Sequence, residues 1–200
     1  MSLARHARLE VPECRLQTIG ARRVFMVKRF DVTAPGGRYH MVSLSTLCKE
    51  RPGIYVHSYS DLAHVLRKHS AAPEEDLAAL YRHMVFNAAI GNVDDHLKNF
   101  WMLARPGGFR LAPAFDLVPD ISGRGEHTLS FRHDFSCPLH AEMVALAAEW
   151  GVAGAERIVQ DVVNATKTFS TLARRLKVRH AGSLQKVCAD VRRRTELLSA

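Results

Sequence analysis

The sequence has 200 residues, of which 47% are hydrophobic, and it carries a formal net charge of +8. This length and composition suit one folded domain with a substantial core and exclude a mainly disordered chain. No apolar run approaches the roughly 20 residues of a membrane span, and no apolar segment follows the N-terminal residues as in a secretory signal.

Charge and cysteine usage bear on partners and compartment. The basic residues are scattered, with small clusters at 22–23, 174–175 and 192–194, which is typical of solvated helix ends. A nucleic-acid binder is therefore an alternative that rests on the charge alone, because it would need a concentrated basic face. The four cysteines form no C-x-x-C pair, so neither a zinc site nor a disulfide framework is expected, and a reducing cytoplasm fits best.

The N-terminal part of the chain predicts a small β unit, and its first 30 residues resemble sheet. Residues 15–19 and 24–30 are rich in β-branched and aromatic residues and flank a turn at Gly20, which is the pattern of a hairpin. Pro35 and the two glycines after it break the chain. We therefore expect a hairpin unit over residues 1–36 and a helical lobe over residues 37–200.

From residue 40 onward the hydrophobic period is that of helices, interrupted by one polar stretch. Pro73 and the acidic residues after it are typical of a helix start, and Gly91 is typical of a helix end. Residues 99–103 and 109–111 flank a Pro-Gly-Gly turn and predict a second, small hairpin. Helices are predicted at 40–49, 60–69 with Tyr59 or Ser60 in the cap region, 73 to about 91, 138–150, 154–176 and 181–197, with breaks at Gly151 and Gly182. The predicted fold class is mainly α, with two short hairpins.

The polar stretch between the long helix and the C-terminal helices has the residue types of a phosphoryl-transfer site. Asp94 precedes Asn99 by five positions, the spacing of the base and the metal-binding Asn in a kinase catalytic loop. Asp116 follows an aromatic residue on the far side of the small hairpin, where a kinase places its second magnesium ligand. Lys98 lies between them in the sequence and is suited to contact phosphate.

The chemistry of phosphoryl transfer explains why these residue types matter. The reaction asks for positioning and charge neutralisation more than for covalent chemistry. Mg²⁺ takes hard oxygen ligands and is held by one or two carboxylates together with phosphates and water. A separate carboxylate accepts the proton of the attacking hydroxyl. An Asn and an Asp from two loops, with a further Asp beside them, can meet these demands.

A structural interpretation of the same loop is also open. Asn92, Asp94 and Asp95 can form a turn cluster after a helix, as these residue types commonly do. The position of Asp116 favours the catalytic interpretation. His96 is left open between a contact to nucleotide or metal and a structural role. Asp95 is expected to be a spectator, because it precedes Asn99 by only four positions.

Several segments resemble HipA-type serine/threonine kinases, the toxins of bacterial toxin–antitoxin modules. The run "NAAIGNVDDHLKNFWML…GGFRLAPAFDLVPD" is similar to the family pattern "IGNTDDHxKN", a hairpin, then "RLAPxYDL", with Val93 in place of Thr and Phe115 in place of Tyr. The segments "VPECRLQTIGARRVFMVKRFD", "HMVSLSTL" and "SYSDLAHVL" resemble a hairpin near the adenine hinge and the helices after it. Residues 138–197 resemble the C-terminal bundle. The resemblance covers nearly the whole chain and implies a protein-kinase-like C-lobe that uses ATP and Mg²⁺.

The resemblance also implies roles for individual residues. Asp94 would be the catalytic base, and Asn99 and Asp116 would hold Mg²⁺. Backbone groups at the hinge would bind adenine, whereas Arg29 and Asp31 fit a salt-bridged strand end at least as well as a functional role. The residues that the resemblance assigns to the ATP site are Lys28, Phe30, His96, Lys98, Asn99, Phe115 and Asp116.

The N-terminal lobe of these kinases has no counterpart in the sequence. Family members place a Gly-rich loop and a β-strand lysine before the hinge, whereas Gly20 is the only glycine in residues 1–27 and Lys28 is the first lysine. The chain is therefore expected to be half of a split kinase, a truncated gene product or a fragment. Loss of two charge-assisted hydrogen bonds, about 1.5–3 kcal/mol each, would weaken ATP binding on the order of a hundredfold.

Two functional hypotheses follow from the resemblance. The first is a cytoplasmic protein serine/threonine kinase of a toxin–antitoxin system, with a helix-turn-helix antitoxin or an N-lobe subunit as partner. Contact with DNA would be indirect, through the antitoxin, and no membrane is involved. An aminoacyl-tRNA synthetase is the substrate that the family suggests, although no residue identifies it. The second hypothesis is a catalytically silent lobe that binds an antitoxin or complements another subunit.

Overall fold

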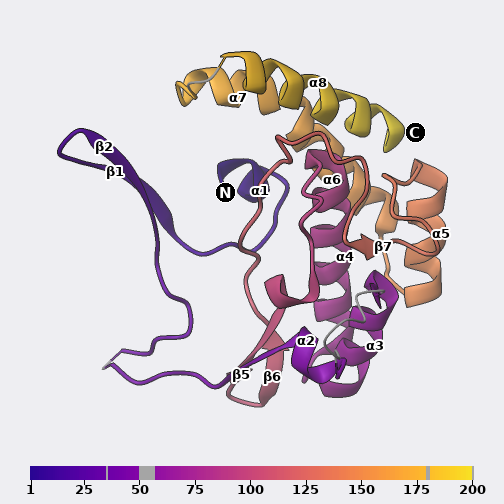
Figure 1. Cartoon of the computed structure of the whole chain (residues 1–200). Coiled ribbons are helices and arrows are strands. Elements are labelled where there is room, and N and C mark those ends of the chain that lie inside the picture. The colour runs from indigo at the N-terminus through magenta and orange to yellow at the C-terminus, as the bar shows by residue number, and fades with distance from the viewer. Residues whose placement is uncertain (35, 50–56, 179–180, 200) are drawn as a thin grey trace.

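The computed structural model describes residues 1–34, 36–49, 57–178 and 181–199, and it is mainly helical, with one β-hairpin projecting from the helical lobe (Figure 1). In these ranges no helix has both the length and the apolar character needed to cross a membrane. The helices are α1 (Ser2–His6), α2 (Leu44–Leu47), α3 (Tyr59–His69), α4 (Pro73–Ile90), α5 (His140–Trp150), α6 (Ala155–Lys167), α7 (Phe169–Arg175) and α8 (Ala181–Leu197), with a 3-10 turn η1 (Leu97–Asn99). The strands are β1 (Cys14–Ile19), β2 (Arg22–Val27), β3 (Met41–Ser43), β4 (His57–Ser58), β5 (Trp101–Arg105), β6 (Gly108–Leu111) and β7 (Leu129–Ser130).

The long helix α4 forms the centre of the lobe, and α3, α5, α6 and α8 pack around it. It begins with Pro73 in its first turn, followed by three acidic residues that suit the positive helix start. It ends at Gly91, which adopts the left-handed conformation at φ +66° that glycine tolerates best. Both predicted ends of this helix are confirmed, because both are encoded by local residues.

The first ten residues belong to the helical lobe and not to the predicted sheet. Helix α1 packs against α6, and Leu3, Ala4, Ala7 and Leu9 are buried in the common core. The strands begin only at Cys14. This correction has a physical reason: α1 is too short to show a helical period, and its burial depends on α6, which is distant in the sequence.

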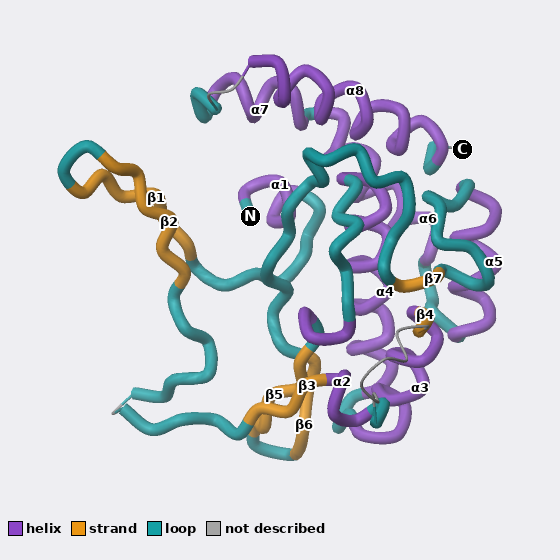
Figure 2. Tube along the Cα trace, viewed as in Figure 1, coloured by secondary structure: helices purple, strands orange, loops and turns teal. Residues whose placement is uncertain are grey.

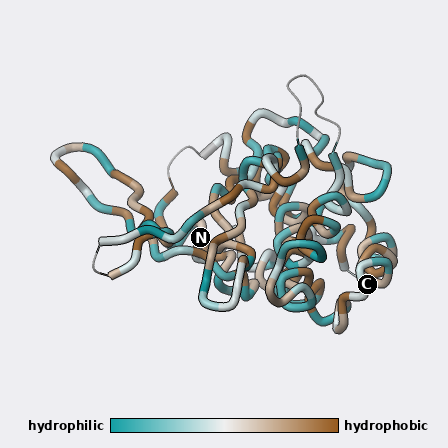
Figure 3. The backbone as a smooth tube through the Cα atoms, turned by 90° about the horizontal axis from the view of Figure 1, so that it is seen from below, coloured by the Kyte–Doolittle hydropathy of each residue, from teal (hydrophilic) through white to brown (hydrophobic). Residues whose placement is uncertain are grey.

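Strands β1 and β2 form an antiparallel ribbon that turns at Gly20 and projects from the lobe (Figures 1 and 2). The second strand ends at Val27, before the predicted end at Phe30. Hydrophobic and hydrophilic stretches follow one another along the ribbon (Figure 3). Its large apolar side chains, among them Leu16, Ile19 and Phe25, are exposed.

The predicted helix at 40–49 is a strand followed by one helical turn. Strand β3 pairs antiparallel with β5, which in turn pairs with β6, so the small predicted hairpin is two strands of a three-stranded sheet. Ser43 ends the strand and starts α2, because its Oγ accepts a hydrogen bond from the Thr46 backbone N–H at 3.1 Å. The strand was missed because its pairing partner lies about 60 positions away in the sequence.

Two further boundaries differ from the sequence prediction. The cap of α3 is Ser58, one residue before the predicted cap region, and it forms a capping box with Asp61. The helix predicted at 154–176 is divided into α6 and α7 at Thr168, whose hydroxyl donates to the Ala165 carbonyl at 2.7 Å. Such bonding of a threonine to the preceding turn competes with helix continuation. Gly182 lies inside the first turn of α8 and does not break it.

Candidate active site

The polar stretch after α4 forms an irregular loop that ends in η1. The Asp94 side chain is 60% exposed, whereas Asn99 is buried. The Asn99 side-chain amide donates to the Asp94 backbone carbonyl at 2.9 Å, which closes the five-residue spacing into one structural unit. The Asn99 amide nitrogen points toward the Asp94 carbonyl in this bond. The Asn99 Oδ1, which is an acceptor, therefore points away from that carbonyl.

Asp95 anchors this loop, a structural role that its prediction as a spectator of the chemistry did not include. Its carboxylate is fully buried and accepts a hydrogen bond from the Tyr59 hydroxyl at 2.6 Å and from His127 Nδ1 at 2.9 Å. The backbone N–H groups of Thr128 and Leu129 donate to its other oxygen at 2.9 and 3.3 Å. Burial of one carboxylate in the sequence pair thus holds the other, Asp94, at the surface.

A chain of side-chain hydrogen bonds leads from Asp95 to the second half of the site. Burial, reinforced by the Asp95 charge, raises the pKa of Tyr59 well above its ordinary value, so its hydroxyl keeps its proton. That hydroxyl accepts from Asn87 at 3.0 Å. The Asn92 amide donates to Asn87 Oδ1 at 3.1 Å and to the Asp116 backbone carbonyl at 3.3 Å. The loop and Asp116 are therefore positioned by the same buried contacts.

Asp116 has a strained backbone and an exposed side chain. Its φ is +56°, in the left-handed region that non-glycine residues seldom occupy. Four residues later, the Asp120 backbone N–H donates to the Gly91 carbonyl at 2.9 Å, so this segment is also attached to the end of α4. Backbone strain that neighbouring contacts maintain is typical of functional positions.

A cavity of about 270 Å³ brings Asp94 and Asp116 together. Arg124 lines the same cavity, and its guanidinium lies 3.9 Å from the Asp94 carboxylate and 3.9 Å from that of Asp120. Burial alone would raise the pKa of Asp120, but hydrogen bonds from Ser122 and from the Arg124 backbone lower it below its ordinary value. Arg124 is not among the predicted site residues. Its position between Gly123 and Gly125 is the sequence feature that could have indicated it.

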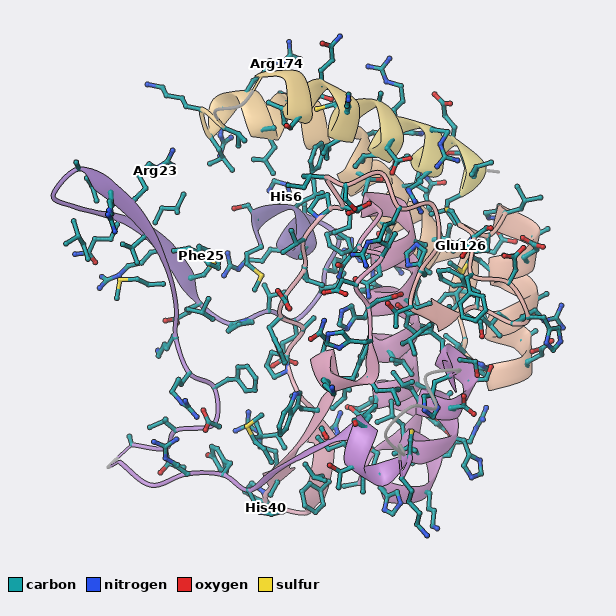
Figure 4. The ribbon with its side chains drawn as sticks, in the orientation of Figure 1. His6, Arg23, Phe25, His40, Glu126 and Arg174 are labelled. Atoms are coloured by element: carbon teal, nitrogen blue, oxygen red, sulfur yellow. The ribbon has the colours of Figure 1, made fainter. Side chains whose placement is uncertain are left out.

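A second cavity, of about 690 Å³, lies where the projecting hairpin joins the lobe. The Phe30 and Phe115 rings are 6.0 Å apart in it. Phe25, labelled in Figure 4, lines it from the hairpin. The predicted ATP-site residues that line this cavity are Lys28, Phe30, Lys98, Phe115 and Asp116. Asp116 borders both cavities.

Some predicted site residues lie outside the two cavities or form other contacts. His96 and Asn99 line neither of these two cavities, and His96 Nδ1 is buried without a hydrogen-bond partner. The Lys28 ammonium forms an exposed ion pair with Glu13 at 3.0 Å, and its backbone N–H donates to the Glu13 carbonyl. Asp31 forms a two-point bond with Arg29, and this bond lowers the pKa of Asp31, as the structural interpretation of that pair expects.

Comparison with known proteins assigns the family. The model of the HipA-like C-terminal domain matches residues 1–169, so the chain belongs to that family of kinase-related proteins. Two proteins of Sinorhizobium fredii are similar in sequence. "Putative kinase Y4dM" is 31% identical over 153 residues, which are 66% of this chain and 36% of that protein. "Putative kinase Y4mE" is 37% identical over 70 residues, which are 32% of this chain and 17% of that protein.

Two solved structures share the fold. HipA of Shewanella oneidensis MR-1, solved with HipB and its operator DNA, aligns with a TM-score of 0.74 at 18% identity over 98% of this chain and 53% of that one. The Helicobacter pylori proinflammatory kinase CtkA aligns with a TM-score of 0.69 at 13% identity over 98% of this chain and 80% of that one. The chain thus spans about half of HipA and about a third or less of the two curated relatives.

Proposed function

We propose that this chain is the catalytic lobe of a HipA-type serine/threonine kinase, which transfers the γ-phosphate of ATP to a hydroxyl group of a protein. The observation that carries the proposal is the loop geometry. Buried Asp95 holds Asp94 outward, Asn99 bonds back to Asp94, and Asp116 borders the same cavity as Asp94 from a second loop. The family membership of residues 1–169 supports the same conclusion.

Asn99 and Asp116 suit Mg²⁺ by the chemistry of their donor atoms. Each offers a hard oxygen, and Mg²⁺ prefers such oxygens and keeps phosphate and water in its remaining positions. In the part of the chain that the structure describes, no cluster of three His, Cys, Asp or Glu side chains forms a complete metal cage. Mg²⁺ carried in with ATP does not need one. When bound, the ion would neutralise charge on the transferred phosphate.

Asp94 is proposed as the base that orients the substrate hydroxyl and accepts its proton. Its carboxylate is exposed, so a protein substrate can reach it. Arg124, within 3.9 Å of this carboxylate, is suited to attract phosphate charge as the reaction proceeds. Lys98, which is exposed at the larger cavity, is suited to the same task from the other side of Asp116.

The adenine ring is proposed to occupy the 690 Å³ cavity that Phe30 and Phe115 line from one side. Because the Lys28 N–H is already bonded within the hairpin, the hinge contacts would come from the backbone of residues 29–30. A complete kinase also uses a Gly-rich loop and a phosphate-binding lysine before the hinge, and residues 1–27 contain neither. ATP affinity of the isolated chain is therefore expected to be weak.

The partners are proposed by analogy with the HipA structure, which was solved with HipB and operator DNA. A helix-turn-helix antitoxin would bind the chain in the cytoplasm, and DNA contact would pass through that antitoxin. An aminoacyl-tRNA synthetase as substrate rests on the family resemblance. A catalytically silent lobe that complements another subunit is the second candidate, and the exposed apolar side chains of the β1–β2 ribbon favour it.

Calorimetry with ATP and Mg²⁺ tests the proposal. We expect Mg²⁺-dependent binding by the chain and its loss in Asp116→Asn. Asp94→Asn should retain binding but transfer no phosphate to a protein substrate. Absence of binding up to millimolar ATP would contradict a self-sufficient kinase and favour the silent lobe. Mixing the chain with an N-lobe polypeptide would then show whether binding is restored.

A further inference from the structure

Helix α8 places one arginine, Arg194, in the interior of the lobe. The Arg194 side chain is 1% exposed, although it carries a charge. Its Nε donates to Asp190 on the same helix at 2.7 Å, its Nη1 lies 3.2 Å from His127 Nε2, and its Nη2 donates to the Gly125 carbonyl at 3.4 Å. Burial of a charged guanidinium costs desolvation free energy, which these contacts must offset. Each contact also restricts the geometry of the others.

His127 joins Arg194 to the anchor of the catalytic loop. Its Nδ1 faces the Asp95 carboxylate at 2.9 Å and its Nε2 faces the Arg194 guanidinium at 3.2 Å. A carboxylate can only accept and a guanidinium can only donate, so the ring carries its proton on Nδ1 and accepts at Nε2. The imidazole is thereby fixed in one orientation, with its N–H aimed at Asp95.

The same helix also presses on the first residue of the loop. A Cβ atom placed on Gly91 would lie 2.9 Å from Arg194 Nε and 3.0 Å from Asp190 Oδ2. The ion pair on α8 therefore occupies the space directly beside Gly91, where α4 ends.

Helix α8 lies outside the part of the chain that matches the HipA-like C-terminal domain, since that match ends at residue 169. We propose that Arg194 and His127 are positioning residues for the candidate active site. Arg194 orients His127, which holds Asp95, and Asp95 sets the place of Asp94 and Asn99. The effect of Arg194 and His127 on phosphoryl transfer rests on the proposed function, whereas their effect on the position of the loop does not.

Amide hydrogen exchange of the whole chain tests the loop part of the proposal. Arg194→Met removes the guanidinium and keeps an apolar stem in its place. Arg193→Met is the matched control, because Arg193 bonds to the same Asp190 at 2.8 Å but its side chain is 58% exposed. We expect exchange at the Leu129 amide, which donates to Asp95, to be at least about tenfold faster in Arg194→Met than in Arg193→Met. Amides in the middle of α4 should exchange at the wild-type rate in both variants.

A metal-dependent comparison tests the positioning part. Affinity for ATP is measured with and without Mg²⁺, and the ratio of the two affinities is the gain from Mg²⁺. A misplaced loop should reduce this gain and leave the affinity without Mg²⁺ unchanged. We expect that gain to fall at least about fivefold in Arg194→Met and to stay at the wild-type value in Arg193→Met. His127→Gln, which keeps a donor and an acceptor, should retain more of the gain than His127→Phe, which keeps only the ring.

Each outcome decides the proposal. Equal exchange in the two arginine variants would overturn it, and so would faster exchange in Arg194→Met with an unchanged gain from Mg²⁺. If the wild-type chain binds no ATP, the proposed function fails, and the exchange comparison alone then decides whether α8 holds the loop. If Arg194→Met loosens α4 as well, the His127→Gln and His127→Phe pair supplies the same comparison.

Discussion

The β1–β2 hairpin and the loop after α4 are opposite kinds of structure. The hairpin is regular and in register over all six residues of each strand, yet nearly all its side chains are exposed. The loop has almost no regular structure, yet Asp95, Asn92 and Asn99 within it are buried and hydrogen-bonded. A two-stranded ribbon without a packed face is marginally stable in water. Side-chain burial, and not backbone regularity, therefore fixes the geometry of the candidate site.

Removal of the loop anchor should have the largest effect. Asp95→Ala removes a buried acceptor from the Tyr59 hydroxyl, from His127 and from the Leu129 backbone N–H, while the Thr128 N–H keeps the Val93 carbonyl at 3.0 Å. We expect the free energy of unfolding to fall by about 3–5 kcal/mol, measured by urea denaturation. Asp94→Ala, which removes the neighbouring exposed carboxylate, is the control and should change it by less than about 0.5 kcal/mol. Equal effects would contradict the assignment of Asp95 as the anchor of the loop.

Acid should weaken the lobe through a buried histidine that packs on the residue after the loop. Burial lowers the pKa of His83 to about 4, and its ring lies 4.7 Å from that of Phe100. The folded chain therefore keeps His83 neutral while the unfolded chain binds a proton below pH 6.5. This contribution to stability is complete above pH 6.5 and is lost as the pH falls toward 4, by about 3 kcal/mol in total. His83→Gln should flatten this part of the curve of unfolding free energy against pH, and an unchanged slope would assign it to other groups.

A methyl group at the start of the loop should have an intermediate effect. Gly91→Ala places a Cβ in a left-handed backbone and against the Asp190–Arg194 pair, so we expect a loss of about 1–3 kcal/mol in unfolding free energy. Gly151→Ala is the matched control, because Gly151 also ends a helix at a left-handed φ of +67° but no atom lies within 4 Å of its added Cβ. The difference between the two thermal unfolding curves isolates the contact with α8.

Substitution in the hairpin should have the smallest effect. Phe25→Ser removes a large but exposed side chain, so we expect unfolding free energy to change by less than about 0.5 kcal/mol. The same substitution should, however, lower ATP affinity, because Phe25 borders the proposed adenine cavity. A large loss of stability would show that the hairpin is packed in solution and would remove the contrast with the loop.

The sequence predicts those features whose causes are local. The ends of α4 follow from Pro73 and Gly91, and the pairing of Asp94 with Asn99 follows from their spacing, so both could be expected from the order of the residues alone. The helix α1, the strand β3 and the burial of Asp95 could not, because each depends on partners far along the chain. The Asp95 partners Tyr59 and His127, for example, are 36 and 32 positions away.

The roles within the site show the same limit. The resemblance to HipA-type kinases implies seven ATP-site residues, and the structure gathers five of them around one cavity, namely Lys28, Phe30, Lys98, Phe115 and Asp116. The sequence alone could not indicate which of Asp94 and Asp95 would be buried, since both have the same chemistry. Only their partners distinguish them, and those partners lie in α3 and in the segment before β7.

The location of Arg194 in the last helix has a consequence for protein synthesis. Residues leave the ribosome in order from the N-terminus, so Asp94, Asn99 and Asp116 emerge well before α8. Until α8 is released, His127 lacks its guanidinium partner, and the loop lacks the contacts that α8 makes with it through His127. A nascent chain would thus carry Asp94, Asn99 and Asp116 before the contacts that position them have formed.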